Sequence, residues 1–416
     1  MPNVSFTSLV VVAAIAVGAP LLVGRFPRIG VPAVVLEIVG GIIVGPHGLK
    51  LVKTVDAPVQ ILAFVGLAFL LFLAGLELDL ERLKGRLLRL ALLGFVVTLG
   101  LGLAAGTLFK ATGTVRSPLF IAIALSATSL GLVVPVLKDA GQITTRLGQL
   151  TIAASSVADF GAVVLLTLFF SGQHSTGTGA KVVLLGGFAV LAAVVAFALA
   201  RLNRVMRFSD ILLKLQDTTA EIRVRMAVLL LVGFVALAEH FGLETILGAF
   251  IAGGLLGIVD RDSATHPHFR LKLEAIGYGF VVPVFFVASG LRFDLGALVH
   301  SPAAFARVPI FLLALLIVRG VPAALYRRSV GTRGAVAVGL LQATSLPFLV
   351  AATAIGQSLH LILPVNGAAL VAAGLLSVVI FPPVALGLLR RVAEPASEHA
   401  PSVLAPHASR SSSWPC

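Results

Sequence analysis

Residues 127–134 read ATSLGLVV, and residues 343–350, which follow 216 positions later, read ATSLPFLV. Each copy pairs hydroxyl side chains with helix breakers, Gly131 and Pro135 in the first copy and Pro347 in the second. A membrane helix tolerates broken backbone only where it lines a cavity. The copies lie seven expected spans apart and so enter the membrane in opposite directions, which predicts inverted repeats with two discontinuous helices. A chance match, with prolines that only kink their helices, is the alternative.

The composition indicates a membrane protein. Of the 416 residues, 58% are hydrophobic and 12% charged, and the mean hydropathy is +1.07, more than one water-soluble core can bury. Because a span needs about 20 apolar residues, we expect an all-α integral membrane protein with about 13 transmembrane helices. The expected spans are residues 7–24, 30–47, 59–76, 90–109, 117–137, 147–171, 182–200, 226–242, 244–259, 274–290, 308–326, 335–356 and 362–389.

The formal charge of +13 follows the membrane topology and does not indicate a nucleic-acid partner. Of the 31 Lys and Arg residues, 23 fall in one set of alternate connections, seven in the other, and Arg319 lies within a span. The positive-inside rule therefore places the N-terminus outside and the C-terminus in the cytoplasm. The first apolar stretch lacks the flanks of a signal peptide. Residues 392–416 read as a disordered cytoplasmic tail, and we expect no soluble regulatory domain.

Three charged residues lie well inside expected spans, namely Glu37, Asp159 and Arg319. A charge at the bilayer centre costs at least about 2.5 to 3.5 kcal/mol, so such residues are usually functional or tightly paired. Ser155 and Ser156 precede Asp159 by four and three positions and share its helix face. A carboxylate beside hydroxyls is a hard oxygen site, suited to a monovalent metal cation or a proton. No cofactor is expected.

Each of these charges also has a structural interpretation. Asp159 could bond to a neighbouring helix. Glu37 precedes the small-residue run 40–45, which favours close helix packing, and a packing role is preferred for it. Arg319 keeps its proton and is therefore a fixed positive charge. It either acts electrostatically on the ion path or has a structural role, in which it pairs with an acid or caps the carboxyl end of a half-helix.

Further stretches carry a resemblance over nearly the whole chain up to about residue 390. They are residues 31–37 (VPAVVLE), 45–48 (GPHG), 72–79 (FLAGLELD), 242–253 (GLETILGAFIAG) and 283–290 (PVFFVASG). Together they resemble the monovalent cation:proton antiporter-2 family of sodium or potassium/proton antiporters. The resemblance implies a core of two inverted repeats with two crossed discontinuous helices, which moves against a dimerising scaffold in an elevator motion.

The resemblance also implies a division of the chain. The expected parts are scaffold helices 1–3 in residues 1–89, core repeat one with helices 4–6 in 90–171, linker helix 7 and a cytoplasmic loop in 172–225, scaffold helices 8–10 in 226–306, core repeat two with helices 11–13 in 307–391, and the tail 392–416.

The same resemblance assigns roles at the ion site. Asp159 would bind the cation or proton, Thr128 would lie at the crossing, and Arg319 would take the place of a basic residue that is often lysine. The expected supporting residues are Ala127, Ser129, Gln342, Thr344 and Glu37, and the expected cation and proton ligands are Asp159, Thr128, Ser155 and Ser156. The sequence departs from the family at Ala158, where a polar or acidic residue is common.

A single carboxylate predicts exchange. It is neutral with a proton, nearly neutral with a monovalent cation such as Na⁺ or K⁺, and charged only when it holds neither, so the loaded forms cross the membrane. We expect an electroneutral antiporter, homodimeric, in the cell (inner) membrane. A sodium-coupled symporter of a small organic anion on the same fold is the alternative, and a passive channel also remains open. An enzyme is not expected, because no nucleophile with its base and no metal-ligand cluster stands inside a span.

Overall fold

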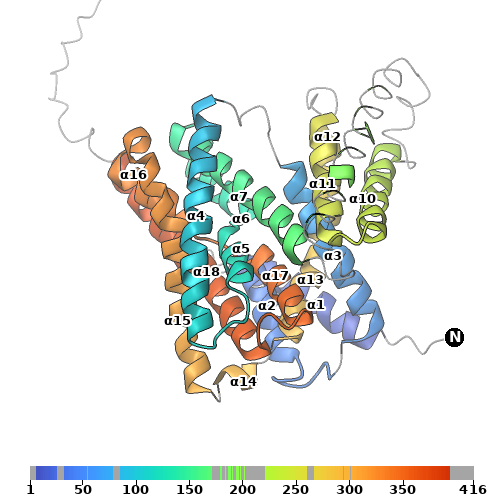
Figure 1. Ribbon diagram of the computed structural model, residues 1–416. Helices are drawn as coiled ribbons and strands as arrows, with labels where there is room; N and C mark the ends of the chain where they lie inside the picture. The colour runs from blue at the N-terminus through green and yellow to red at the C-terminus, as the bar shows by residue number, and fades with distance from the viewer. Residues whose placement is uncertain are drawn as a thin grey trace, which may run out of the picture.

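The structure of the protein, a computed structural model, is helical throughout the residues it describes (Figure 1). These are residues 6–25, 32–53, 55–77, 85–170, 221–259, 267–293, 295–299 and 301–393, with isolated positions between 179 and 201. Within these ranges the one β interaction is an antiparallel bridge between Val115 and Ile362. The prediction of an all-α fold is confirmed.

The helices coincide with the predicted apolar stretches. The first half contains α1 (Thr7–Arg25), α2 (Ala33–Val44), α3 (Ala57–Leu76), α4 (Gly85–Ala111), α5 (Pro118–Ser126), α6 (Leu130–Asp139) and α7 (Arg146–Phe170). The second half contains α10 (Ile222–His240), α11 (Thr245–Val259), α12 (Pro267–Ile276), the π-helical η2 (Gly277–Val281), α13 (Val282–Leu291), α14 (Leu295–Val299), α15 (Pro302–Leu315), the π-helical η3 (Leu316–Gly320), the 3₁₀-helical η4 (Val321–Tyr326), α16 (Arg327–Gln342), α17 (Pro347–Ser358) and α18 (Pro364–Ala393).

Seven helical segments of the described chain are long and apolar enough to cross a membrane. They are Thr7–Arg25, Ala57–Leu76, Gly85–Ala111, Arg146–Phe170, Phe269–Leu291, Phe305–Gln342 and Pro364–Leu389, and shorter apolar helices accompany them at Ala33–Val44, Pro118–Val134 and Thr245–Ile258. The predicted span at 182–200 lies almost wholly outside the described residues, as does the predicted tail beyond Ala393. Every other predicted span coincides with a helical segment.

Both predicted helix breaks are present, and they meet. Residues 127–129 separate α5 from α6, and residues 343–346 separate α16 from α17. Between them the Ser129 N–H donates to the carbonyl oxygen of Thr344 at 3.0 Å. The predicted breakers of the first copy, Gly131 and Pro135, are nevertheless inside α6, so that part of the prediction was wrong. The first break comes before them.

The two broken helices run in opposite directions. At the start of α5 the Arg116 N–H donates to the Leu361 carbonyl at 3.0 Å, just after the end of α17. The bridge between Val115 and Ile362 lies at the same point. Since the beginning of one broken helix lies beside the end of the other and their breaks touch midway, the pair is antiparallel, as an inverted repeat requires.

The helices pack as two groups (Figure 1). In the crossing group, residues 85–170 and 302–393, helices α4–α7 pack against one another and against α15–α18. In the flanking group, residues 7–76 and 222–291, α3 packs on α11 and α2 on α13. Glycines bring the α3 and α11 backbones together: a side chain at Gly75 would meet the Phe250 carbonyl, and one at Gly253 the Phe72 carbonyl. The position of α3 relative to α11 is therefore tightly constrained.

Candidate functional site

Asp159 is half-buried on α7 and faces the first helix break. Its Oδ1 accepts the backbone N–H of Thr128 at 2.9 Å, and the N–H of Leu130, the first residue of α6, also acts on the carboxylate. The first N–H groups of a helix have no intrahelical partner and form its positive end, so α6 stabilises an anion at this position. The same contact explains the break, because it turns the Thr128 N–H away from the helical bonding pattern of α5.

Arg319 lies on the other side of the crossing. It is 1% exposed and belongs to η3, a π-helical turn of the kind often found at functional sites. Its Nε donates to the carbonyl oxygen of Gln342, the last residue of α16, at 3.3 Å. The last carbonyls of a helix lack intrahelical partners and form its negative end, so the guanidinium caps α16. Of the roles that the sequence left open, the hydrogen bonds correspond to capping a half-helix, while the charge of Arg319 also acts on Asp159.

Thr128 connects the carboxylate to the guanidinium. Its N–H bonds Asp159, while its hydroxyl donates to the Gln342 carbonyl at 2.9 Å and accepts a hydrogen bond from Arg319 Nη2. Arg319 Nη1 also points to the hydroxyl of Thr98 on α4, at 3.5 Å. The proton and one lone pair of the Thr128 hydroxyl are thus engaged. Thr128 therefore contributes to the site chiefly through its backbone.

The two serines before Asp159 have less engaged side chains. Ser155 and Ser156 are 0% and 2% exposed, one helical turn before the carboxylate on α7. Among the described residues, the Ser155 hydroxyl has no hydrogen-bond partner. Buried hydroxyls are nearly always bonded, so an unpartnered one next to an acid is a candidate ligand for a cation.

The remaining predicted residues divide between the crossing and the flanking group. Ala127 and Ser129 lie in the first break, and Gln342 and Thr344 at the second. The Thr344 hydroxyl donates back to the Leu340 carbonyl at 3.2 Å and so is also engaged. Glu37 is buried on α2, which packs on α13 in the flanking group. The described contacts do not bring Glu37 to the crossing.

Two residues near the crossing were missed by the sequence analysis. Ser377 on α18 accepts the Ser345 N–H at 3.2 Å, the counterpart in repeat two of the bond between Thr128 and Asp159. The 216-residue offset of the repeat places Leu375, and not Ser377, at the position of Asp159, so the offset alone could not have indicated it. Glu77 directly follows α3 and acts electrostatically on Asp159. Glu77 lies within residues 72–79, one of the stretches that carry the family resemblance, but the neighbouring sequence does not show which helix its side chain faces.

Fold and site together define a class of protein. Antiparallel broken helices that present their ends to a half-buried carboxylate are a feature of secondary active transporters, which expose one central site to either side in turn. The chain matches the family model described as sodium/hydrogen exchanger, transmembrane, over residues 11–389, and it belongs to this family. The family consists of transporters and not of enzymes.

Named relatives agree with this placement. The putative Na⁺/H⁺ antiporter YjbQ of Bacillus subtilis is 32% identical over 376 residues, which cover 87% of this chain and 59% of the relative. A Na⁺/H⁺ antiporter of Enterococcus hirae is 29% identical over 280 residues, covering 64% of this chain and 68% of that protein. The solved sodium proton antiporter MjNhaP1 of Methanocaldococcus jannaschii has a TM-score of 0.63 and 19% identity, covering 92% of this chain and 98% of its own. That likeness concerns the fold.

Proposed function

We propose that this chain exchanges a monovalent cation, Na⁺ or K⁺, for H⁺, with Asp159 as the binding site that both ions share. The observation that carries the proposal is the contact between the Asp159 carboxylate and the Thr128 N–H at the first helix break. This contact leaves the carboxylate beside hydroxyl oxygens and between half-helix ends. The relatives named above as Na⁺/H⁺ antiporters, and one named a Na⁺/H⁺-K⁺ antiporter in Bacillus cereus, support the choice of ions.

The ligands of the cation would be the Asp159 carboxylate and the hydroxyl of Ser155, with Ser156 beside them. Carboxylate and hydroxyl oxygens are the hard ligands that such cations prefer. Thr128 would hold the carboxylate in place, and Arg319 would hold the end of α16, so that the crossing keeps its shape while the ion changes. In this arrangement Arg319 is structural support and Asp159 the titrating group.

Exchange follows from the charge of the site. With a proton or a monovalent cation bound, the carboxylate is close to neutral, whereas without either it carries an uncompensated charge. Moving that charge through a low-dielectric barrier adds a desolvation penalty of several kcal/mol. The loaded forms therefore move and the unloaded form does not. Because both ions compete for one carboxylate, the activity should rise with pH as Asp159 loses its proton.

The moving part would be most of the crossing group, within the bounds that the sequence predicts for the core. We infer that residues 90–171 and 307–391 form a core that slides against a scaffold of residues 1–89 and 226–306, with 172–225 as the linker. The close backbone packing at Gly75 and Gly253 supports a stiff scaffold. By the same proposal the protein is a homodimer in the cell membrane, with its N-terminus outside and its C-terminus in the cytoplasm, as the distribution of Lys and Arg indicates.

The test is flux through purified protein in liposomes, with a pH dye inside. Outward gradients of Na⁺, K⁺ and Li⁺ should each be tried, and at least one should drive H⁺ inward in the parent and not in Asp159→Asn. Flux of a cation with an organic anion, with no movement of H⁺, would contradict the proposal. Flux of the cation that does not depend on H⁺ would indicate a channel instead.

We further propose a ratio of one proton to one cation. The position before Asp159 is Ala158, which is buried and cannot titrate, and Arg319 keeps its charge at physiological pH. The loaded core then carries the same charge in both directions, so a membrane potential, worth about 2.3 kcal/mol per charge per 100 mV, does no work. A potassium and valinomycin potential should leave the equilibrium Na⁺ gradient unchanged. A voltage-dependent gradient that persists in Glu37→Gln would require another titrating group.

A further inference from the structure

The outer face of α4 changes from charged to apolar along the helix. Arg86 and Arg89, near the beginning of α4, are both exposed. Leu93 and Val96 continue the same face and are 56% and 65% exposed. Their spacing of three or four residues keeps these side chains on one side of an α-helix. This side of α4 is therefore an apolar stripe that ends in two guanidinium groups.

A second stripe of the same kind runs along the segment from α15 to η4. Its apolar side chains recur every three or four residues and are each between 42% and 55% exposed, namely Ile310, Leu313, Ile317, Val321 and Leu325. Arg328, which is also exposed, follows them at the start of α16. The segment thus repeats the arrangement of α4, with an apolar stripe that ends in an arginine.

The two stripes end at the same membrane surface. A side chain at Gly94 of α4 would meet the Tyr326 hydroxyl, and further along α4 the Thr98 hydroxyl lies 3.5 Å from Arg319 Nη1. Residue numbers rise along α4 as they fall along its neighbour, so the two segments are antiparallel. They pack side by side, as α4 and α15 do in Figure 1. Past the contact with Tyr326, both segments continue to the arginines that end their stripes.

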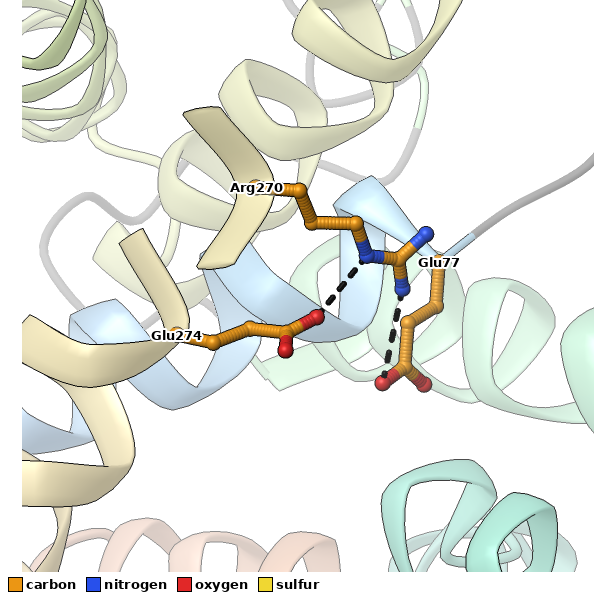
Figure 2. Close-up of polar contacts among 3 residues, drawn as sticks. All are labelled: Glu77, Arg270 and Glu274. Atoms are coloured by element: carbon orange, nitrogen blue, oxygen red, sulfur yellow. Dashed lines mark hydrogen bonds and ion pairs between the residues drawn. The ribbon is translucent and has the colours of Figure 1, made fainter. Parts of the chain in front are cut away.

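These arginines lack the ion pairs that basic side chains of the flanking group make. In that group Arg270 donates to Glu274 at 2.8 Å and approaches Glu77 at 3.9 Å (Figure 2). Lys272 likewise bonds Glu221 at 2.7 Å. Among the described residues, none of the three arginines that end the stripes makes an ion pair. Their charge is therefore free to bind a partner from outside the chain.

Exposed guanidinium groups next to apolar side chains that face lipid suit a phospholipid with a net negative headgroup. A guanidinium binds phosphate oxygens through two parallel hydrogen bonds. A free phosphate ion would not use the apolar stripes. A zwitterionic headgroup would bring its own positive charge to the arginines. Charge and apolar surface together thus favour an anionic phospholipid.

We propose that the ends of α4 and η4 form a binding site for an anionic phospholipid, with its phosphate at Arg86, Arg89 and Arg328 and its acyl chains along the two apolar stripes. By the orientation proposed above, this site faces the cytoplasmic leaflet, whose anionic lipids attract basic side chains. The site lies on the crossing group and goes beyond the proposed ion exchange. It does not depend on Asp159, so Asp159→Asn should bind the lipid as the parent does.

The experiment uses native mass spectrometry to count lipids bound to the full chain in detergent. Phosphatidylglycerol and phosphatidylcholine with identical acyl chains are offered in turn, and the parent should retain phosphatidylglycerol preferentially. Arg86→Gln, Arg89→Gln and Arg328→Gln should each lower the affinity for phosphatidylglycerol about fivefold, and the triple variant should lower it further. The affinity for phosphatidylcholine should not change.

Lys110→Gln is the matched control, because Lys110 is exposed at the opposite end of α4 and its loss removes the same charge. It should bind phosphatidylglycerol as the parent does. Inorganic phosphate should not displace the bound lipid, because phosphate makes no use of the apolar stripes.

Four results would overturn the proposal. The parent could retain both lipids equally, or the triple variant could retain phosphatidylglycerol as the parent does. An equal loss in Lys110→Gln would show that binding follows only the net charge of the chain. Displacement by inorganic phosphate would indicate a site for a free anion. If the triple variant has a lower melting temperature than the parent, the three single variants decide by the same criteria.

Discussion

The two repeats hold their broken helices in the same way but with different chemistry. In repeat one the Thr128 N–H bonds the carboxylate of Asp159 on α7, at 2.9 Å. In repeat two the Ser345 N–H bonds the hydroxyl of Ser377 on α18, at 3.2 Å. Each contact joins a helix break to the last helix of its own repeat. The geometry of the repeat is thus maintained by a charged or a neutral hydrogen-bond acceptor, and only repeat one uses a charged one.

The neutral acceptor, the Ser377 hydroxyl of repeat two, also makes further hydrogen bonds. The Ser377 hydroxyl donates to the Gly374 carbonyl at 2.7 Å and lies 3.3 Å from the Ser345 carbonyl. Its proton and one of its two lone pairs are thus engaged. Arg319, from repeat two, meanwhile supports the crossing through Thr128 of repeat one. Repeat two therefore supports, through Arg319, the proposed ion site in repeat one, and the following predictions test this division.

The largest effect is expected for Asp159→Asn. An amide neither gains a proton in this pH range nor balances the charge of a cation, so Na⁺-driven H⁺ flux should fall to the level of empty liposomes. The amide oxygen can still accept the Thr128 N–H, so the variant should elute from a sizing column at the parent volume. Exchange retained in this variant would mean that the difference between the repeats has no role in transport.

Arg319→Ala should chiefly affect stability. It removes the cap of α16 and the partner of the Thr128 hydroxyl, and breaking a buried charged contact typically costs about 3 to 5 kcal/mol. The melting temperature in detergent should fall, while Arg319→Lys, which keeps the charge, should retain exchange. An alanine variant of normal stability with a changed affinity for Na⁺ would instead make Arg319 part of the ion path.

Ser377→Ala should be a milder loss of the same kind. It leaves the buried Ser345 N–H without a partner, which costs about 1 to 3 kcal/mol. The KM for Na⁺ should stay within twofold of the parent, because no ion binds in repeat two. If this variant instead loses affinity for Na⁺ as strongly as it loses stability, the second repeat contributes to the site after all.

The smallest effect is expected for Ser155→Ala. Removing one neutral oxygen ligand should raise the KM for Na⁺ several-fold, and it should leave the melting temperature unchanged or higher, because this hydroxyl has no partner to lose among the described residues. Thr167→Val is the control, since its hydroxyl on α7 is also buried and, within the same residues, unpartnered. A KM that changes in neither variant would make Ser155 a packing residue.

Thr128→Val, which also weakens the bonds to Arg319, should lower both the affinity for Na⁺ and the melting temperature.

The sequence by itself determined the membrane class, the approximate spans, the two breaks and the candidate acid. These features are local. Lipid requires about 20 apolar residues per helical span, and a charge inside such a stretch is conspicuous wherever its helix packs. The repeated motif at 127–134 and 343–350 was readable for the same reason, because it is a property of short segments and their spacing.

Other features were decided by the tertiary structure alone. The first break falls before Gly131 and Pro135 because Asp159, 31 positions beyond Thr128, takes the N–H there. Arg319 caps α16 because η3 brings it to the Gln342 carbonyl. The flanking group meets α7 because α11, which packs on α3, also contacts α7. Each of these features depends on the distance between residues far apart in the chain. Helix packing sets that distance, and the local composition of the sequence does not.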